Sequence, residues 1–441
     1  MVRLVVLNYN GGDLTLRCLE HLHRLDWPAE RLEVVVVDNA STDGSVERVA
    51  QAFPGVEIRR NAENGGFPAN NLALRDLDGI DYVGLVNNDA FVDPGWLAAL
   101  VATLEEDPAV GAVSSKLVLE PRFVEVSLTS PTFVPGPEDP RPLGVMLRDV
   151  RREGVSLRRQ AHFGDGGGGM EHDRDGAFEW TSGSARLRVP VDGAGPGTTV
   201  TLRLQAERTK DVEIDGGRGI LTAVVGTRPV DIEVPVGGEP FDVLNNVGSI
   251  VFTDGAGADR GWLERDHGQY DDPADVFAWC GGSVLFRPAY LADVGLLDER
   301  FFLYYEDTDL SWRGRARGWV HRTAPASKAR HVHAATSEEG SAVFAHHVER
   351  NRLLMLVKNA PAGMVGRQLW RFVLVTASYA RRDVVAPVLR GRRPRGLVVR
   401  RRIGSLVGVL RLLPAMLGDR RSLRRAQKVP DSELLAWFVD H

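Results

Sequence analysis

The feature that most constrains this chain is the alternation of short apolar runs with amphipathic stretches across residues 1–118. Five apolar runs have the length and composition of buried strands, namely 4–7, 34–37, 56–58, 82–86 and 110–114. Stretches with helical periodicity lie between them, as where Leu14, Leu19 and Leu22 share one face. This alternation predicts an α/β fold with a doubly wound, mainly parallel sheet. Such sheets bind their ligands at the carboxyl ends of the strands.

The rest of the 441 residues changes character twice. Residues 119–243 alternate polar and apolar positions between Gly and Pro turns, which predicts an inserted all-β sandwich domain. Strand and helix patterns resume in residues 244–340, whereas residues 341–441 are helical and rich in Arg and Leu. We therefore expect four parts, 1–118, 119–243, 244–340 and 341–441, with the first and third forming one α/β domain.

The net charge of −5 hides a basic C-terminal region. Residues 361–441 carry 17 Lys and Arg against 5 Asp and Glu, whereas the remaining residues carry 37 against 54. Amphipathic helices with many Arg residues favour an anionic membrane surface, although a solvated helical cap or a dimer interface would have the same composition. The chain has no uninterrupted apolar run of the roughly 18 residues that span a bilayer.

Two cysteines, Cys18 and Cys280, provide no disulfide framework, and the first residues resemble a core strand rather than a cleavable signal. These features favour the cytoplasm. Together with the basic helices, they predict a cytoplasmic protein that is peripheral on the inner face of the cell membrane.

Polar residues follow the first two predicted strands. Asn8, Tyr9 and Asn10 end the first, and Asp38 ends the second directly after four valines. An aromatic ring can stack on a nucleobase, and a carboxylate can accept a hydrogen bond from the N3–H of uracil or thymine. Asp38 therefore favours a uridine or thymidine nucleotide. The loop with Asn64 and Gly66 follows the third strand, where glycine allows a ligand to approach the backbone.

The fourth predicted strand ends in Asn87, Asn88 and Asp89. Asp89 is the one acidic residue at this strand end, and a carboxylate there can hold Mg²⁺ or Mn²⁺ against a diphosphate. Asn87 can bind an oxygen or a metal-bound water without adding charge. A capping role for Asp89 remains the alternative.

A third cluster combines two glycines, an aromatic residue and an acidic run. Trp279, Gly281 and Gly282 interrupt a strand-like stretch, where the glycines allow a sugar to lie against the backbone. Glu306 and Asp307 follow a run of aromatic and apolar residues. Adjacent carboxylates in an apolar setting raise each other's proton affinity, which suits a general base. Asp309 has the position of a first-turn helix residue.

Two histidines follow this acidic run. His331 and His333 alternate on a predicted strand, so they share a face and could ligate a metal.

These clusters, in this order, resemble glycosyltransferase family 2, and in particular its bacterial rhamnosyltransferase-like members. The matching motifs are Asn8-Tyr9-Asn10, Asp38-Asn39-Ala40-Ser41, Asn64-x-Gly66-Phe67, Asn87-Asn88-Asp89, Gly281-Gly282 and the run from Phe301 to Leu310. The resemblance covers about residues 1–118 and 244–358 and implies the GT-A fold. Asn87 stands where the family's Asp-x-Asp has its first acid, and residues 119–243 have no counterpart in the minimal fold.

The resemblance implies a role for each cluster. Asp307 would be the base, with Glu306 tuning the site, while Asp89 and His333 would hold the metal. Trp279, Gly281 and Gly282 would contact the acceptor or sugar. The nucleotide would contact Asn8, Tyr9, Asn10, Asp38, Asn64, Gly66, Asn71, Asn87 and Asn88.

The function implied is an inverting hexosyltransferase, with rhamnose as one candidate sugar. The donor would be a UDP- or dTDP-sugar, and the acceptor a glycan or polyprenyl-diphosphate-linked glycan in cell-surface polysaccharide synthesis. An anionic membrane surface and a second copy of the chain are further candidate partners, whereas nucleic acid is not expected. The alternatives are a non-catalytic glycan-binding scaffold and a nucleotidyltransferase on a similar fold.

Overall fold

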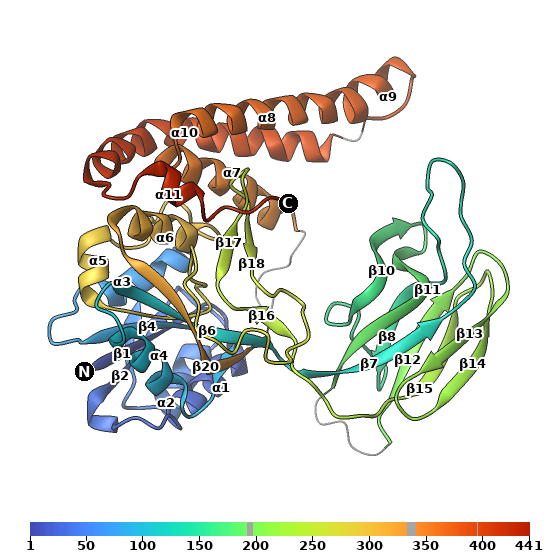
Figure 1. Ribbon diagram of the computed structural model, residues 1–441, viewed down its shortest axis with the longest axis horizontal. Coiled ribbons are helices and arrows are strands. Elements are labelled where there is room, and N and C mark those ends of the chain that lie inside the picture. Colours follow the sequence, from blue (N-terminus) through green and yellow to red (C-terminus); the bar gives the residue numbers. More distant parts are fainter. Residues whose placement is uncertain (192–196, 333–340, 395) are drawn as a thin grey trace. The chain divides into compact units, whose positions relative to one another are not determined.

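The computed structural model describes residues 1–441 except 192–196, 333–340 and 395. The chain forms two compact units (Figure 1). Unit 1 comprises Met1–Val118, Asn245–Trp262 and Gln269–His441, and unit 2 comprises Leu119–Leu244 and Leu263–Gly268. Residues of the helical C-terminal part therefore belong to the same unit as the α/β sheet.

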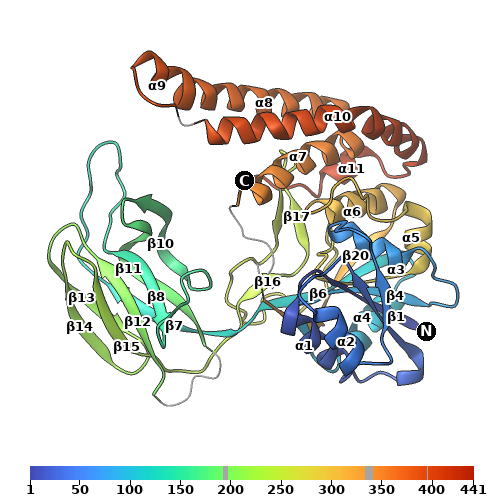
Figure 2. The same ribbon diagram turned by 180° about the vertical axis from the view of Figure 1, so that it is seen from behind.

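The sheet of unit 1 has a parallel half and an antiparallel half, in the order β3-β2-β1-β4-β19-β6-β20-β5, with β16 beside β6 (Figures 1 and 2). The strands β3, β2, β1 and β4 are parallel, whereas β19 is antiparallel to both β4 and β6 and β20 is antiparallel to β5. The sheet is thus mixed, because β19, which follows the insertion, runs opposite to its neighbours β4 and β6. The bounds are β1 Val2–Asn8, β2 Leu32–Asp38, β3 Glu57–Arg60, β4 Tyr82–Asn87, β5 Ala90–Val92, β6 Val110–Leu119, β16 Leu244–Asn246, β19 Ser283–Phe286 and β20 Val320–His331.

Helices cover both faces of this sheet because its strands are apolar on both sides. Leu4 and Val6 of β1 pack with α1, α2 and α4, whereas Val5 packs with α3, α5 and α6. A smaller antiparallel pair, β17 and β18, lies in the same unit. The bounds are α1 Gly12–Leu22, η1 Ala29–Arg31, α2 Ser45–Ala52, η2 Phe67–Asn70, α3 Asn71–Leu74, α4 Trp96–Glu105, β17 Ser249–Val251, β18 Gly257–Asp259, α5 Pro288–Val294 and α6 Glu306–Arg317.

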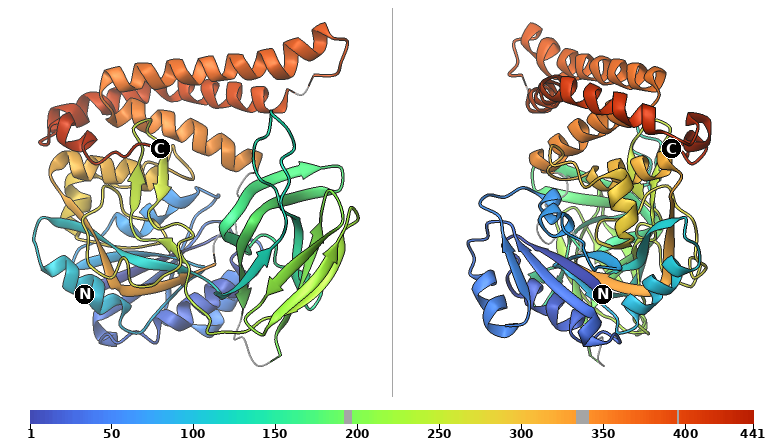
Figure 3. Two further views of the ribbon diagram at one scale, coloured as in Figure 1. Left: turned by 45° about the vertical axis from the view of Figure 1, so that its right-hand side comes forward. Right: turned by 90° about the vertical axis from the view of Figure 1, so that its left-hand side faces the viewer.

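The C-terminal helices share one core with residues of the α6 region. Leu353, Leu354, Phe372 and Met416 pack in a cluster that also contains Trp312. The long helices α8 and α10 run side by side in both panels of Figure 3. No helix in the described ranges is long and apolar enough to cross a membrane. The bounds are α7 Ala342–Asn359, α8 Ala362–Ala380, η3 Arg381–Val385, α9 Ala386–Leu389, α10 Leu397–Ala426 and α11 Asp431–Leu435.

The regular elements in the described residues of unit 2 are strands, which form one hydrogen-bonded path β14-β13-β7-β11-β8-β12-β15 with β10 beside β11 and β9 beside β8. Alternate residues of its strands form one apolar core, as Val124 and Val126 of β7 and Leu202 and Leu204 of β12 do. The alternation in the sequence therefore marks the inward face. The bounds are β7 Arg122–Thr129, β8 Met146–Arg152, β9 Val155–Ser156, β10 His162–Asp173, β11 Gly176–Val191, β12 Thr199–Gln205, β13 Lys210–Asp215, β14 Ile220–Val225 and β15 Val230–Pro235.

Candidate active site

The ends of β1 and β2 lie side by side, because the parallel register pairs Asn8 with Asp38. The Asn8 side chain is buried, and its Nδ2 donates to the hydroxyls of Ser41 and Ser45 at 3.0 and 2.9 Å. Its Oδ1 accepts from the Thr15 hydroxyl at 2.7 Å and from a backbone N–H at 3.3 Å. With both donors and both lone pairs engaged, Asn8 holds the two strand ends together and has no capacity left for a ligand.

Tyr9 and Asp38 differ from Asn8 in what they offer. The Tyr9 side chain is exposed to 43%, so its ring can stack on a planar ligand. Asp38 is only 4% exposed. Its carboxylate accepts from the Ser41 N–H at 3.1 Å, and its Oδ2 lies 3.9 Å from Nη1 of Arg60. Asn10 is engaged in the same turn, because its Oδ1 accepts from the Thr42 N–H at 2.7 Å.

Asn39 organises the loop after β3, a role that the sequence motifs did not indicate. Its Oδ1 accepts from Asn61 and from the Gly65 N–H at 3.2 and 2.9 Å, while its Nδ2 donates to Asn64 at 2.8 Å. Gly66 has a φ of 69°, and a Cβ there would collide with the carbonyl of Phe302. Glycine is therefore required at this position, and the loop packs directly against the segment that precedes Glu306.

Asn71 and Asn88 are structural in this arrangement. Asn71 exchanges two hydrogen bonds with the backbone of Leu297, at 2.8 and 3.1 Å. The buried Asn88 donates to the Thr15 hydroxyl at 3.1 Å. These contacts fix local backbone and direct both side chains into the protein.

Asp89 is paired with His331. The register of β20 against β5 places His331 opposite Ala90, and its Nε2 lies 3.1 Å from Oδ1 of Asp89. The other ring nitrogen, Nδ1, is 2.8 Å from Oδ1 of Asn245, so it carries the hydrogen and donates it. Burial lowers the pKa of His331, but the Asp89 and Asp259 carboxylates outweigh it and the pKa is raised.

The donors around Asp89 fit a hard divalent cation. Asp89 offers a carboxylate oxygen of the kind that Mg²⁺ and Mn²⁺ bind, and His331 offers an imidazole whose second nitrogen is held by the amide oxygen of Asn245. Asn87 lies close by, with its Nδ2 3.4 Å from Nε2 of His331. His333 lies outside the described residues. Among those that the structure describes, no group of three or more His, Cys, Asp or Glu side chains could hold a metal. Two protein ligands would leave the other positions to phosphate and water oxygens.

Glu306 and Asp307 begin α6 and form a pair of carboxylates with raised pKa values. Burial raises the pKa of Glu306 well above its usual range, and the charge of Asp307 raises it further. Burial also raises the pKa of Asp307, against the N–H and hydroxyl of Thr308, and the Asp259 carboxylate adds to the effect. Oε2 of Glu306 has no hydrogen-bond partner in the described part of the chain. Glu306 is 5% exposed, whereas Asp307 is only half-buried and thus the more accessible of the two.

The segment with Trp279 lies beside Asp307 but contributes backbone rather than a ring. Trp279 is completely buried and packs against Phe286, with ring centroids 4.9 Å apart, which leaves no ring face for a sugar. A Cβ on Gly281 would lie 2.9 Å from the ring of Phe67, and one on Gly282 would lie 3.0 Å from Leu117. The Gly281 N–H hydrogen-bonds to Asp307 and opposes the rise in its pKa.

Asp259 and Asn245 are site residues that sequence reasoning missed. Asp259 acts on the pKa values of both Asp307 and His331, and it accepts from Asn246. It ends β18, in a stretch where the sequence offers only Gly-Ala-Asp-Arg. No motif could have identified it, because its proximity to Asp307 depends on the folding of residues far apart in the chain.

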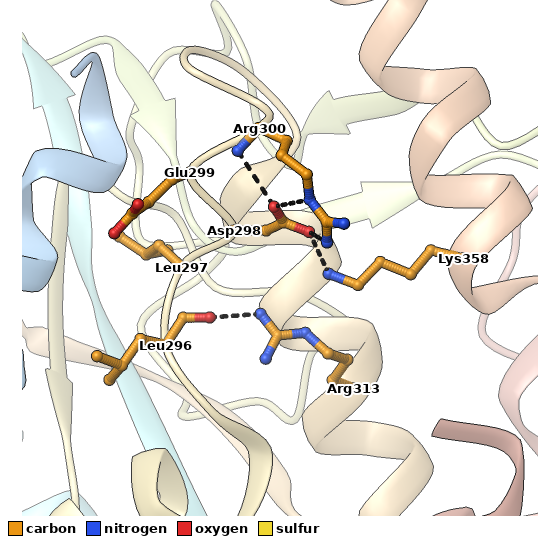
Figure 4. Close-up of a pocket in the computed structure, with 7 residues that line it drawn as sticks. All are labelled: Leu296, Leu297, Asp298, Glu299, Arg300, Arg313 and Lys358. Carbon is orange, nitrogen blue, oxygen red and sulfur yellow. Dashed lines mark hydrogen bonds and ion pairs between the residues drawn. The ribbon is translucent and has the colours of Figure 1, made fainter. Parts of the chain in front are cut away.

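A separate cavity of about 440 Å³ is lined by residues that include Asp298, Arg300, Arg313 and Lys358 (Figure 4). Its centre is Asp298, which accepts from Arg300 and from Lys358 at 2.7 Å. Lys358 also bonds the fully buried Asp309 at 2.8 Å, and Arg313 bonds it at 3.0 Å. Every charge here has a partner of opposite sign, which is typical of a structural ion-pair cluster.

Comparison with known proteins connects this site to one family. The model of glycosyl transferase family 2 matches residues 4–142. The uncharacterized glycosyltransferase YibD of Escherichia coli is 32% identical over 165 residues, which cover 36% of this chain and 45% of that protein. The N-acetylglucosaminyl-diphospho-decaprenol L-rhamnosyltransferase of Mycobacterium tuberculosis is 36% identical over 72 residues, which cover 16% of this chain and 24% of that protein. The chain thus spans less than half the length of these relatives.

Among solved structures, GalNAc-T7 with UDP, GalNAc and Mn²⁺ aligns over 81% of this chain and 50% of that chain. The identity is 11% and the TM-score 0.42, a likeness too weak to bear on ligands. The sequence match is the stronger finding, because it includes the strand ends with Tyr9, Asp38 and Asp89. Residues 4–142 are therefore similar to glycosyl transferase family 2.

Proposed function

We propose that the protein is an inverting glycosyltransferase that moves a hexosyl group from a UDP- or dTDP-sugar to a glycan or polyprenyl-diphosphate-linked acceptor. Rhamnose is a candidate sugar, and synthesis of a cell-surface polysaccharide is the candidate process. The observation that carries the proposal is the gathering of three unlike groups in one unit: the exposed Tyr9 ring beside Asp38, the Asp89–His331 pair, and Asp307 with a raised pKa.

Recognition of the donor would use the ends of β1 and β2. Tyr9 offers its face to the base, and Asp38 accepts from the N3–H that uracil and thymine have and cytosine lacks. Asn39, Asn64 and Gly66 shape the loop next to this pocket through the hydrogen bonds described above. If Tyr9 were only a turn residue that binds no ligand, its replacement by alanine would leave the affinity for the nucleotide unchanged.

A divalent metal, Mg²⁺ or Mn²⁺, would be held by Asp89 and His331 and, through the predicted contact, by His333. When bound, such a metal neutralises the charge that develops on a departing diphosphate. The chain's own residues prepare for this: Asn245 fixes the tautomer of His331, and the strand register aims its Nε2 at Asp89.

In the transfer step Asp307 would accept the proton of the acceptor hydroxyl. The hydroxyl oxygen attacks the anomeric carbon from the face opposite the diphosphate, and the carbon–oxygen bond to the diphosphate breaks with its electron pair. One displacement of this kind inverts the anomeric centre. The raised pKa of Asp307 makes it a stronger base than an ordinary aspartate, and Glu306 is its buried neighbour in the chain.

A thermal-shift panel tests the donor. We expect the melting temperature to rise with UDP- or dTDP-sugars in the presence of Mn²⁺, because a ligand that binds only the folded state stabilises it by mass action. GDP-sugars serve as the control, since guanine presents a different edge. Donor hydrolysis and the anomeric configuration of the product are then measured. A preference for GDP-sugars, or no shift with any donor, would contradict the proposal.

The alternatives give different outcomes in the same experiments. A glycan-binding scaffold would show no donor hydrolysis, and a nucleotidyltransferase would release diphosphate from a nucleoside triphosphate and a sugar phosphate. A base with a raised pKa in the same unit as a carboxylate–imidazole pair favours sugar transfer over either alternative.

We further propose that the protein binds anionic membrane surfaces through the end of the α8–α10 hairpin. Val388, Leu389 and Leu397 are exposed there to 56, 82 and 83%. Arg390, Arg392 and Arg393, also exposed, lie in the same stretch of chain. Exposed apolar side chains flanked by arginines are typical of segments that dip into the headgroup region.

Co-sedimentation with vesicles tests this surface. We expect binding to vesicles that contain phosphatidylglycerol at low salt, and weaker binding to phosphatidylcholine alone or at high salt. Leu389→Glu should reduce binding, whereas Val343→Glu, at an exposed apolar residue of α7, should not. Equal recovery of the wild type and Leu389→Glu in the supernatant would contradict the proposal.

A further inference from the structure

The segment that leads into α6 has an unfavourable backbone conformation. Phe302, Tyr304 and Tyr305 have φ angles of 66, 68 and 72°, in the left-handed region that residues with a Cβ rarely adopt. Such a conformation persists only where the surrounding structure holds it. Tyr305 is the residue directly before α6, so the path of this segment decides where Glu306 and Asp307 lie.

One side chain of α7 holds most of this segment. Nδ2 of Asn351 lies 2.8 Å from each of the carbonyl oxygens of Phe301, Leu303 and Tyr304. Its two hydrogens thus serve three acceptors, and the side chain is completely buried. Oδ1 of Asn351 accepts from Arg350 at 2.9 Å, which orients the amide with its nitrogen toward the segment.

Neighbouring contacts complete the hold. Arg350 donates to the carbonyls of Arg300 and Phe301 at 3.1 and 3.0 Å. The carbonyl of Phe302 accepts from the N–H of Phe67, the residue directly after Gly66, at 2.8 Å. The segment therefore connects α7 with the loop that we propose for the nucleotide.

The same helix also holds the chain after Asp307. Lys358 and Asn359 bond the carboxylate of Asp309 at 2.8 and 2.7 Å. Asn351 and Lys358 are seven residues apart, or about two helical turns, so they lie on one face of α7. Side chains of helix α7 thus form hydrogen bonds to the chain on both sides of Glu306 and Asp307.

We propose that Asn351 is a positioning residue for the transfer reaction, which fixes the segment 301–305 and thereby the location of the Asp307 carboxylate. This inference rests on the proposed function, because it takes Asp307 as the base. Arg350 assists, and neither side chain needs to touch the substrate.

The test compares Asn351→Ala with Leu354→Ala, a core change on the same helix that removes packing but none of these hydrogen bonds. We expect kcat of Asn351→Ala to fall about 100-fold, since small misplacements of a catalytic group cost this much, with the KM for the donor changed less than about 3-fold. Leu354→Ala at the same folded fraction should keep kcat within about 3-fold of wild type. Equal kcat for the two variants would overturn the proposal.

A second readout needs no activity. Hydrogen–deuterium exchange of the peptide that covers residues 299–309 should be faster in Asn351→Ala than in Leu354→Ala, and unchanged exchange would overturn the proposal. If Asn351→Ala does not fold, Arg350→Ala removes two of the carbonyl contacts and should show a smaller effect of the same kind; exchange like that of Leu354→Ala would overturn it. If wild-type protein transfers no sugar, the proposed function fails, while the exchange data still decide whether Asn351 holds the segment.

Discussion

The carboxylates in the first turn of α6 fall into two groups whose surroundings differ. Asp309 is fully buried with Lys358 and Arg313, whose positive charges outweigh burial and lower its pKa. Burial raises the pKa values of Glu306 and Asp307, and a neighbouring carboxylate adds to the rise in each case, Asp307 for Glu306 and Asp259 for Asp307. Burial alone therefore does not decide the role of an acidic residue. The presence of cations makes Asp309 structural, and the carboxylate neighbours of Asp307 suit it to accept a proton.

The largest effect is expected for Asp307→Asn. We expect kcat to fall by roughly 10²- to 10⁴-fold, the range for loss of a general base, while nucleotide binding stays unchanged. Stability should stay equal or rise, because the change removes a buried charge. The measurements are kcat, the shift in melting temperature with UDP, and the melting temperature itself. Transfer at nearly the wild-type rate would show that another residue is the base.

Lys358→Met tests the other group. It leaves Asp298 and Asp309 buried without their shared cation, which should lower the free energy of unfolding by about 3–5 kcal/mol. Denaturant titration measures this loss. Arg371→Ala, in an ion pair whose arginine is 63% exposed, is the control and should cost less than about 1 kcal/mol. Similar losses of unfolding free energy in the two variants would show that the buried ion pairs stabilise the protein no more than an exposed one.

The pH dependence of stability should also separate the two groups. The pKa values of Asp298 and Asp309 are lowered in the folded protein, so their stabilisation is present above the unfolded value of 3.8 and is lost as the pH falls through the folded values. Glu306 and Asp307 act in the opposite direction, because their raised pKa values favour proton binding by the folded state. We expect Lys358→Met to weaken this acid-induced loss, measured as the denaturant midpoint of unfolding from about pH 5 down to about pH 2. An unchanged slope would contradict the assignment.

The smallest effect is expected for Asp259→Asn. Its carboxylate raises the pKa of Asp307, so its removal should move the acidic limb of the pH profile of kcat/KM to lower pH. The profile is measured beside that of Asp13→Asn, an exposed carboxylate in another part of the unit. A shift in the opposite direction would show that Asp259 acts otherwise than through its charge.

The sequence predicted the parallel half of the sheet well. The runs at 4–7, 34–37 and 82–86 lie within β1, β2 and β4, because buried parallel strands are nearly continuous apolar sequences. The sequence pattern did not reveal the direction of the strands that follow the insertion, and the structure shows that the sheet is mixed rather than mainly parallel. Helix α10 continues through Pro414 to Ala426, where packing against α7 offsets the lost hydrogen bond.

Several site expectations changed once neighbours were known. Trp279 is a core residue, and Asn8 and Asn71 are occupied by internal hydrogen bonds. Of the two histidines, His331 is the one whose pairing with Asp89 the structure describes. Sequence motifs identify residue types that could bind a ligand. An asparagine whose amide holds two strands together occupies the same position in such a motif, so the sequence does not distinguish the two roles.

The sequence by itself determined the polar strand ends, the adjacent Glu306 and Asp307, and the division into α/β, all-β and helical stretches, since these follow from periodicity and chain order. Only the tertiary structure decided which carboxylates have cations, which amides are occupied, and how Asp259, Asn245 and Asn351 reach the α6 start. Each of these depends on contacts between residues distant in sequence. A pKa or a hydrogen bond is a property of the surroundings of a side chain, which the order of residues alone does not specify.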